Sequence, residues 1–198
     1  KLYLFGHSWG GYAVTSVLSL HKNICGCAAI APFNSGYTLL TEKGEQYAGS
    51  LKDSLVGGFP KKFLDAYQAL LFKDYTKLDA VKGINSTDIP VFIAHGTRDF
   101  VISFNHQSVI SHKDEIRQKN VVYYVGTGAY AGHNTILHSE RAVAYQKQVE
   151  KDLKQLKKEC DRELTQEEKA EFCKGVDHAL YSEVNTEMMQ AIVDMFNK

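Results

Sequence analysis

The sequence has no excess of charge of either sign, because its 23 lysine and arginine residues balance 23 aspartate and glutamate residues. A basic patch is the usual electrostatic signature of proteins that bind nucleic acid or anionic lipid, so we expect neither partner. The sequence also lacks an apolar run of the roughly 18 residues that a membrane-spanning helix requires. The composition is therefore that of a soluble globular domain.

Cysteine is scarce, and the four cysteines lack the doubled Cys-x-x-Cys spacing of a structural zinc site. Cys25 and Cys27 lie in a predicted buried strand, whereas Cys160 and Cys173 lie in charged helical sequence. We therefore expect no metal site, and free thiols in a reducing cytoplasm.

Four short apolar segments rich in β-forming residues are separated by helical or mixed sequence. They are residues 2–5, 24–31, 91–95 and 121–125. Unbroken apolar strands that alternate with helices indicate a parallel sheet covered on both faces, so the predicted fold class is α/β, in a single domain over 1–198. In such sheets the functional residues lie just beyond the carboxyl ends of the strands.

The segment between the second and third strands, from Pro32 to Asp88, is too long for a plain connector and is rich in aromatic residues. Pro60 can begin a helix that places Phe63 and Tyr67 on one face. Two interpretations remain open: a lid or cap over about 33–88, or an ordinary sheet-covering helix with a longer loop.

The segment over about 140–174 is predicted to be a charged helical insertion, because about half of its residues are charged. Thr165 and Glu168 form a capping box that predicts a new helix start. A surface insertion is favoured over a dimer contact. The last helix, from Asn185, carries an apolar face that is predicted to pack on the sheet. That face comprises Met188, Met189, Ile192, Val193 and Phe196.

The most informative motif is Gly-His-Ser-Trp-Gly-Gly at 6–11, which follows the first strand and opens a helix-like stretch. This context indicates a nucleophile elbow, a strand-to-helix turn that exposes a serine hydroxyl. The strained turn requires small residues two positions before and after Ser8, and Gly6 and Gly10 supply them. The alternative is a glycine-rich turn in which the serine has no role.

A serine hydroxyl holds its proton at neutral pH, so a nucleophilic Ser8 needs a base and a carboxylate that orients the base. Asp99 follows the third strand on a tight turn, and we predict it as the acid. His133 follows the fourth strand after a glycine-rich loop at 126–132, and we predict it as the base.

Other candidates for these roles are less well placed. His178 is the rival base, but it lies just before the last helix instead of after a strand. His7 is predicted to be structural, because neighbouring side chains on an elbow point apart. Asp79 and Asp88 precede the third strand, at the opposite edge of the sheet from the predicted site, and are predicted to be cap and turn residues.

The chain order Ser8, Asp99, His133 resembles that of the α/β-hydrolase superfamily. The resemblance covers nearly the whole chain and is carried by the elbow, by the His-Gly-x-x-Asp turn within 95–102 and by Gly-His-Asn at 132–134. Within the superfamily, the sequence looks most like the serine aminopeptidase, prolyl oligopeptidase and esterase-like group.

The resemblance implies a serine hydrolase that cleaves an ester or peptide-like acyl bond of a small substrate through an acyl-enzyme. Ser8 would be the nucleophile, His133 the base and Asp99 the acid, and the backbone N–H of Trp9 would supply one oxyanion-hole donor. No metal or organic cofactor is implied. The alternative is a catalytically silent hydrolase-like module that serves binding or assembly.

The sequence begins at the elbow strand, whereas the family has several strands before it. We therefore expect the carboxyl-terminal portion of an α/β-hydrolase fold that lacks its amino-terminal strands, with the second oxyanion-hole donor outside these 198 residues. A strand at 2–5 that is central in the family would then pair with another chain or with the missing amino-terminal half; otherwise we expect an incomplete enzyme of limited activity.

Overall fold

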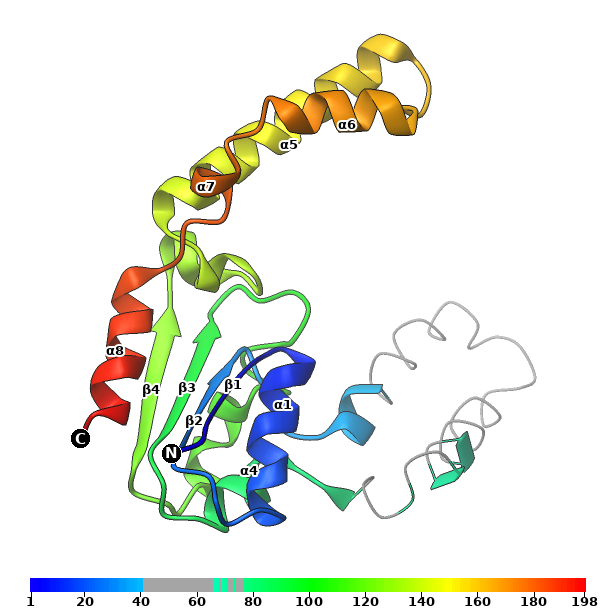
Figure 1. Cartoon of the computed structure of the whole chain (residues 1–198). Helices are drawn as coiled ribbons and strands as arrows, with labels where there is room; N and C mark the ends of the chain where they lie inside the picture. The colour runs from blue at the N-terminus through cyan, green and yellow to red at the C-terminus, as the bar shows by residue number, and fades with distance from the viewer. Residues whose placement is uncertain (41–65, 68, 71–72, 74–76) are drawn as a thin grey trace.

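The computed structural model describes residues 1–40, 66–67, 69–70, 73 and 77–198 (Figure 1). The described residues contain one four-stranded parallel sheet in the order β1-β2-β3-β4. Its strands are β1 (Tyr3–His7), β2 (Gly26–Ile30), β3 (Val91–Gly96) and β4 (Val121–Gly126). The four strands predicted from the sequence and the α/β class are confirmed.

The two inner strands have every residue buried, which explains why they read as unbroken apolar runs. The register pairs Ala28 with Phe92 and Ala94 with Tyr124. β1 lies at one end of the described sheet, and the side chain of Phe5 on it is half exposed. Pairing of β1 with another chain or another segment remains a prediction.

Helices cover both faces of the sheet (Figure 1). On one face, α1 (Trp9–Ser16), the short turn η1 (Val17–Ser19) and α4 (Ala80–Asn85) pack over Val91 and Ile93. On the other face, α8 (Thr186–Phe196) packs over Phe92 and Ala94. Successive side chains of β3 thus enter two separate hydrophobic clusters, as the alternation of a strand requires.

The last helix packs on the sheet as predicted, but part of its predicted apolar face is wrong. Met188, Ile192 and Met195 are buried against the sheet, at the i, i+4, i+7 spacing of one helical face. Val193 was assigned to this face from the sequence, yet its side chain is 48% exposed. Asn185 begins the helix, because its side-chain oxygen accepts a hydrogen bond of 3.1 Å from the backbone N–H of Met188.

A helical arm extends away from the sheet (Figure 1). It consists of α5 (Glu140–Cys160), α6 (Gln166–Lys174) and α7 (His178–Tyr181). Both hydrogen bonds of the predicted capping box between Thr165 and Glu168 are present. α5 buries only Ala142 and Val143, and α6, which is described in full, buries none of its residues. The charged segment is therefore helical, while its role as an insertion remains a prediction.

Most of the predicted lid, including Pro60 and Phe63, lies outside the described residues. The described remainder includes α4, which Asp79 caps by accepting a hydrogen bond of 2.7 Å from the N–H of Lys82. The backbone oxygen of Asp88 accepts a hydrogen bond from the side chain of Asn120, the residue before β4. Asp79 is therefore a helix cap, as predicted, while the assignment of Asp88 as a turn residue stays a prediction.

Candidate active site

Ser8 occupies a strained turn between β1 and α1. Its φ of 58° and ψ of −118° lie outside the regions that side-chain-bearing residues prefer. The backbone N–H of Ser8 donates a hydrogen bond of 2.8 Å to the carbonyl of Ile30, the last residue of β2. Strand β2 therefore holds the turn in place while the hydroxyl of Ser8 projects from the carboxyl edge of the sheet.

The glycines around Ser8 differ in how much space they leave. A Cβ at Gly6 would overlap the carbonyl oxygen of Gly10, so position 6 admits only glycine without a backbone shift. A Cβ at Gly10 would meet nothing within 4 Å, so the expectation that position 10 must be small is wrong. On the helix side of Ser8 the tight position is Gly11, where a Cβ would lie 3.1 Å from the carbonyl oxygen of Ile30.

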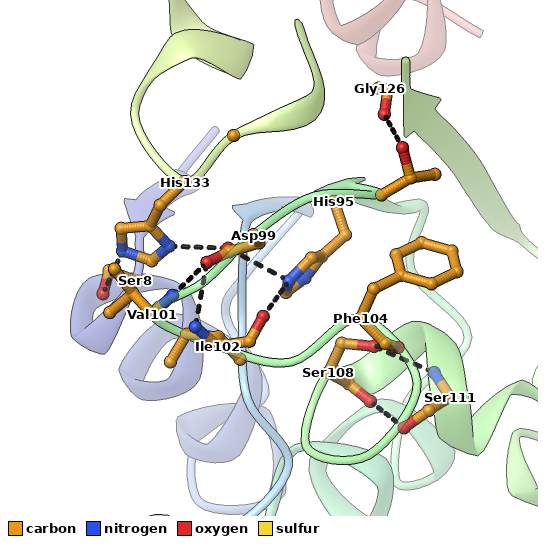
Figure 2. Close-up of polar contacts among 12 residues, drawn as sticks. Ser8, His95, Asp99, Val101, Ile102, Phe104, Ser108, Ser111, Gly126 and His133 are labelled. Atoms are coloured by element: carbon orange, nitrogen blue, oxygen red, sulfur yellow. Dashed lines mark hydrogen bonds and ion pairs between the residues drawn. The ribbon is translucent and has the colours of Figure 1, made fainter. Parts of the chain in front are cut away.

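The three predicted side chains meet at the carboxyl edge of the sheet (Figure 2). The Nε2 atom of His133 lies 3.0 Å from the Oγ of Ser8, and its Nδ1 atom lies 2.7 Å from the Oδ2 of Asp99. A carboxylate oxygen can only accept, so Nδ1 carries the proton. In the neutral ring, Nε2 then has the lone pair that can accept the proton of the Ser8 hydroxyl.

Asp99 is almost completely buried, and hydrogen bonds surround its carboxylate. Its Oδ1 accepts from the backbone N–H groups of Val101 and Ile102, at 2.8 and 2.9 Å. Burial by itself would raise the pKa of Asp99, but the bonds from His133, His95 and the Ile102 backbone outweigh burial and hold the pKa well below its usual range. Asp99 is therefore ionised at neutral pH.

Backbone contacts join the loop of the acid to the loop of the base. The N–H of Arg98 donates a hydrogen bond of 2.8 Å to the carbonyl of Ala131. A Cβ at Gly96 would overlap that same carbonyl, so the close approach of the two loops requires glycine at the end of β3. The separation of Asp99 and His133 is thus fixed by main-chain atoms as well as by their side chains.

Two further histidines adjoin these three residues, and sequence reasoning gave neither a place in the site. The Nε2 of His7 lies 3.0 Å from the backbone oxygen of His133, and the two ring centroids are 4.7 Å apart. Burial lowers the pKa of His7, so the ring is neutral at pH 7 and its Nε2–H donates this bond. The Nε2 of His95 lies 3.2 Å from the Oδ2 of Asp99.

Trp9 is the first residue of α1, and the first N–H groups of a helix have no acceptor within the helix. This position suits the predicted oxyanion donor, a role that remains a prediction. The Trp9 side chain is half exposed and lies edge-on to Phe33, at 4.7 Å between ring centroids. Phe100 and Val101, which follow Asp99, are also exposed apolar side chains.

His178 is exposed at the start of α7 in the helical arm, and it is His133 that contacts Ser8. Within the described part of the chain, no group of three or more histidine, cysteine or acidic residues has an arrangement that could hold a metal ion. No helix among the described residues has both the length and the apolar character needed to cross a membrane.

The sequence matches no protein-family model and has no match among curated protein sequences. Solved structures similar to the chain include an esterase from Pyrococcus furiosus, with a TM-score of 0.45 and 18% identity over 80% of this chain and 53% of that one. An acylaminoacyl peptidase from Pyrococcus horikoshii has a TM-score of 0.41 and 15% identity, over 68% of this chain and 20% of that one.

An acetyl xylan esterase from Thermoanaerobacterium sp. has a TM-score of 0.43 and 17% identity, over 67% of this chain and 40% of that one. The chain therefore spans about half, or less, of the length of each of these three structures.

Proposed function

We propose that the chain carries the nucleophile, base and acid of a serine hydrolase that cleaves an ester or peptide-like acyl bond of a small substrate. The observation that supports this proposal is the continuous set of hydrogen bonds from Ser8 through His133 to Asp99, at 3.0 and 2.7 Å. A buried, ionised carboxylate, an imidazole with its proton on Nδ1 and a hydroxyl at Nε2 are the groups that acyl transfer requires.

In the first half of the reaction, His133 Nε2 takes the hydroxyl proton while the Oγ of Ser8 attacks the carbonyl carbon of the substrate. Asp99 stabilises the resulting imidazolium and holds its orientation. His133 then returns the proton to the leaving group, and the bond between the carbonyl carbon and that group breaks. The acyl group remains attached to Ser8.

In the second half, His133 takes a proton from water, and the oxygen of that water attacks the acyl carbon. The proton returns to Ser8 as the acid product departs. Negative charge develops on the carbonyl oxygen in both halves, and the N–H of Trp9 at the start of α1 would stabilise it. The half-exposed ring of Trp9, the residue after Ser8, favours a substrate with an apolar group beside the scissile bond.

Labelling with a fluorophosphonate probe tests the proposal. The probe should attach covalently to the whole protein, and mass spectrometry should locate the adduct on Ser8. Labelling should vanish in Ser8→Ala and persist in Ser19→Ala, a control at the far end of the same helical segment, where the serine hydroxyl donates a hydrogen bond to the carbonyl of Ser16. An unlabelled wild-type protein would favour the catalytically silent module instead.

A further inference from the structure

His95 is a polar residue in the middle of an apolar region. It is the fifth residue of β3, after Val91 to Ala94, and its side chain is completely buried. The rings of His95 and Phe104 form a T-shaped contact, with 6.0 Å between ring centroids. A buried imidazole destabilises the fold unless its polar atoms find partners, so the bonds that it makes indicate what it does.

The Nε2 atom of His95 has two acceptors, the backbone oxygen of Ile102 at 3.1 Å and the Oδ2 of Asp99 at 3.2 Å (Figure 2). A carbonyl oxygen can only accept a hydrogen bond, so Nε2 must carry a proton, which it shares between the two oxygens. The Nδ1 atom is buried and has no partner among the described residues. A second proton there would be a buried donor without an acceptor among the described residues.

The Asp99 carboxylate thereby has four donors for its two oxygens. Oδ1 accepts from the main chain of Val101 and Ile102, and Oδ2 accepts from His133 and His95. These bonds fix the plane of the carboxylate. The bond from His133 is the shorter of the two at Oδ2, and the bond from His95 arrives from inside the sheet.

We propose, on the basis of the serine hydrolase function above, that His95 is a positioning residue. Its Nε2–H holds the Asp99 carboxylate turned so that Oδ2 faces Nδ1 of His133. Without that donor, the carboxylate keeps its two backbone bonds but has no group holding Oδ2 in place from the core side. The other explanation is a core histidine whose partner is the Ile102 carbonyl alone and which does not act on Asp99.

Two substitutions distinguish these explanations in the full chain. His95→Leu removes the donor, and His95→Gln replaces it with an amide N–H that can reach the same oxygens. Phe92→Leu is the control, because Phe92 is also buried in β3 but packs in the cluster on the α8 face. For each variant, the rate of p-nitrophenyl acetate hydrolysis is measured and divided by the amount of protein that a fluorophosphonate probe labels. The pKa of the Asp99 carboxyl is measured by ¹³C NMR.

We expect His95→Leu to lower kcat/KM about 10- to 100-fold, the usual consequence of losing a hydrogen bond to a charged group, with KM little changed. The pKa of Asp99 should rise in the same variant, and His95→Gln should restore both quantities. Two histidine rings, those of His133 and His95, contact Asp99, and the ring of His7 lies beside His133. The ¹⁵N signals of all three rings are recorded in the same titration. Phe92→Leu should lower only the thermal stability.

An unchanged kcat/KM per labelled site in His95→Leu would overturn the proposal, even if the Asp99 titration moved. If His95→Leu does not fold, the ¹⁵N shifts of His95 in the wild-type protein decide, because a proton on Nδ1 with none on Nε2 would exclude a bond to Asp99. A wild-type protein that neither labels nor hydrolyses the ester refutes the hydrolase function instead, and the Asp99 titration then still reports whether His95 acts on the carboxylate.

Discussion

Nδ1 of His133 lies 2.7 Å from Oδ2 of Asp99, so the carboxylate determines which nitrogen of the ring carries the proton. Because Nδ1 holds the proton of the neutral ring, Nε2, the nitrogen that faces Ser8, has none. The position of this proton depends on an acceptor at Oδ2 of Asp99, so substitution of Asp99 should change the activity.

Asp99→Asn should lower kcat/KM on the order of a thousandfold to ten-thousandfold, because an amide nitrogen facing His133 would favour the tautomer with the proton on Nε2. Ester hydrolysis measured on protein shown to be folded by circular dichroism checks this. Activity within a factor of ten of the wild type would mean that Asp99 does not orient the base.

The lowered pKa of Asp99 also makes stability depend on pH. A carboxyl whose pKa is lower in the folded state than in the unfolded state contributes stability in full above the unfolded value of about 4. That contribution is lost as the pH falls from about 4 toward the folded-state pKa. Between pH 5 and pH 3, the free energy of unfolding should therefore fall more in the wild type than in Asp99→Asn.

Urea denaturation of both proteins at the two pH values measures this difference. The other carboxyls are common to both proteins, so their contribution cancels in the comparison. Equal losses in the two proteins would show that the Asp99 carboxyl is not stabilised in its charged form.

Gly6→Ala and Gly10→Ala should have opposite effects on stability. The new methyl group at position 6 would overlap the Gly10 carbonyl and should lower the free energy of unfolding by about 2 kcal/mol or more. The methyl group at position 10, in the first turn of α1, meets open space, and alanine is favoured over glycine in a helix by up to about 1 kcal/mol. Thermal denaturation of the two variants provides the measurement, and comparable losses at both positions would be inconsistent with this geometry.

His7→Leu should lower kcat about two- to tenfold, because it removes the hydrogen bond that holds the backbone of His133, and a neutral bond of this kind contributes about 1 kcal/mol. His7→Gln keeps a donor and should retain most of the activity. Steady-state kinetics of the two variants against the wild type measure the effect. If both variants lose activity equally, the bond to His133 is not the reason.

Met188→Ala should destabilise the fold by about 2 to 5 kcal/mol, since the side chain is completely buried between α8 and the sheet. Val193→Ala in the same helix should change stability by less than about 1 kcal/mol, because that side chain is half exposed. Chemical denaturation of the pair tests which face of α8 packs on the sheet.

The strands were predictable because β2 and β3 are buried on both faces, and complete burial leaves an unbroken apolar run in the sequence. The positions of Ser8, Asp99 and His133 followed from one rule, that the carboxyl ends of parallel strands share an edge. An apolar strand and the residues that directly follow it can be recognised from a short stretch of sequence, so no contact between distant segments had to be known.

The contacts that sequence reasoning missed depend on how segments approach one another. Position 11 has little space for a side chain because a Cβ there would lie 3.1 Å from the carbonyl oxygen of Ile30, which belongs to β2. The contact of His95 with Asp99 spans four residues, yet it exists only because the turn after β3 folds back over the strand end. Val193 was misassigned because a helical pattern does not show how wide the buried face is.

The main-chain bond between Arg98 and Ala131 has a practical consequence. Since backbone atoms keep the acid and base loops together, removing a reactive side chain should leave the surrounding architecture unaltered. A Ser8→Ala protein would then be an inert receptor of native shape, suited to retaining uncleaved molecules from an extract for identification by mass spectrometry.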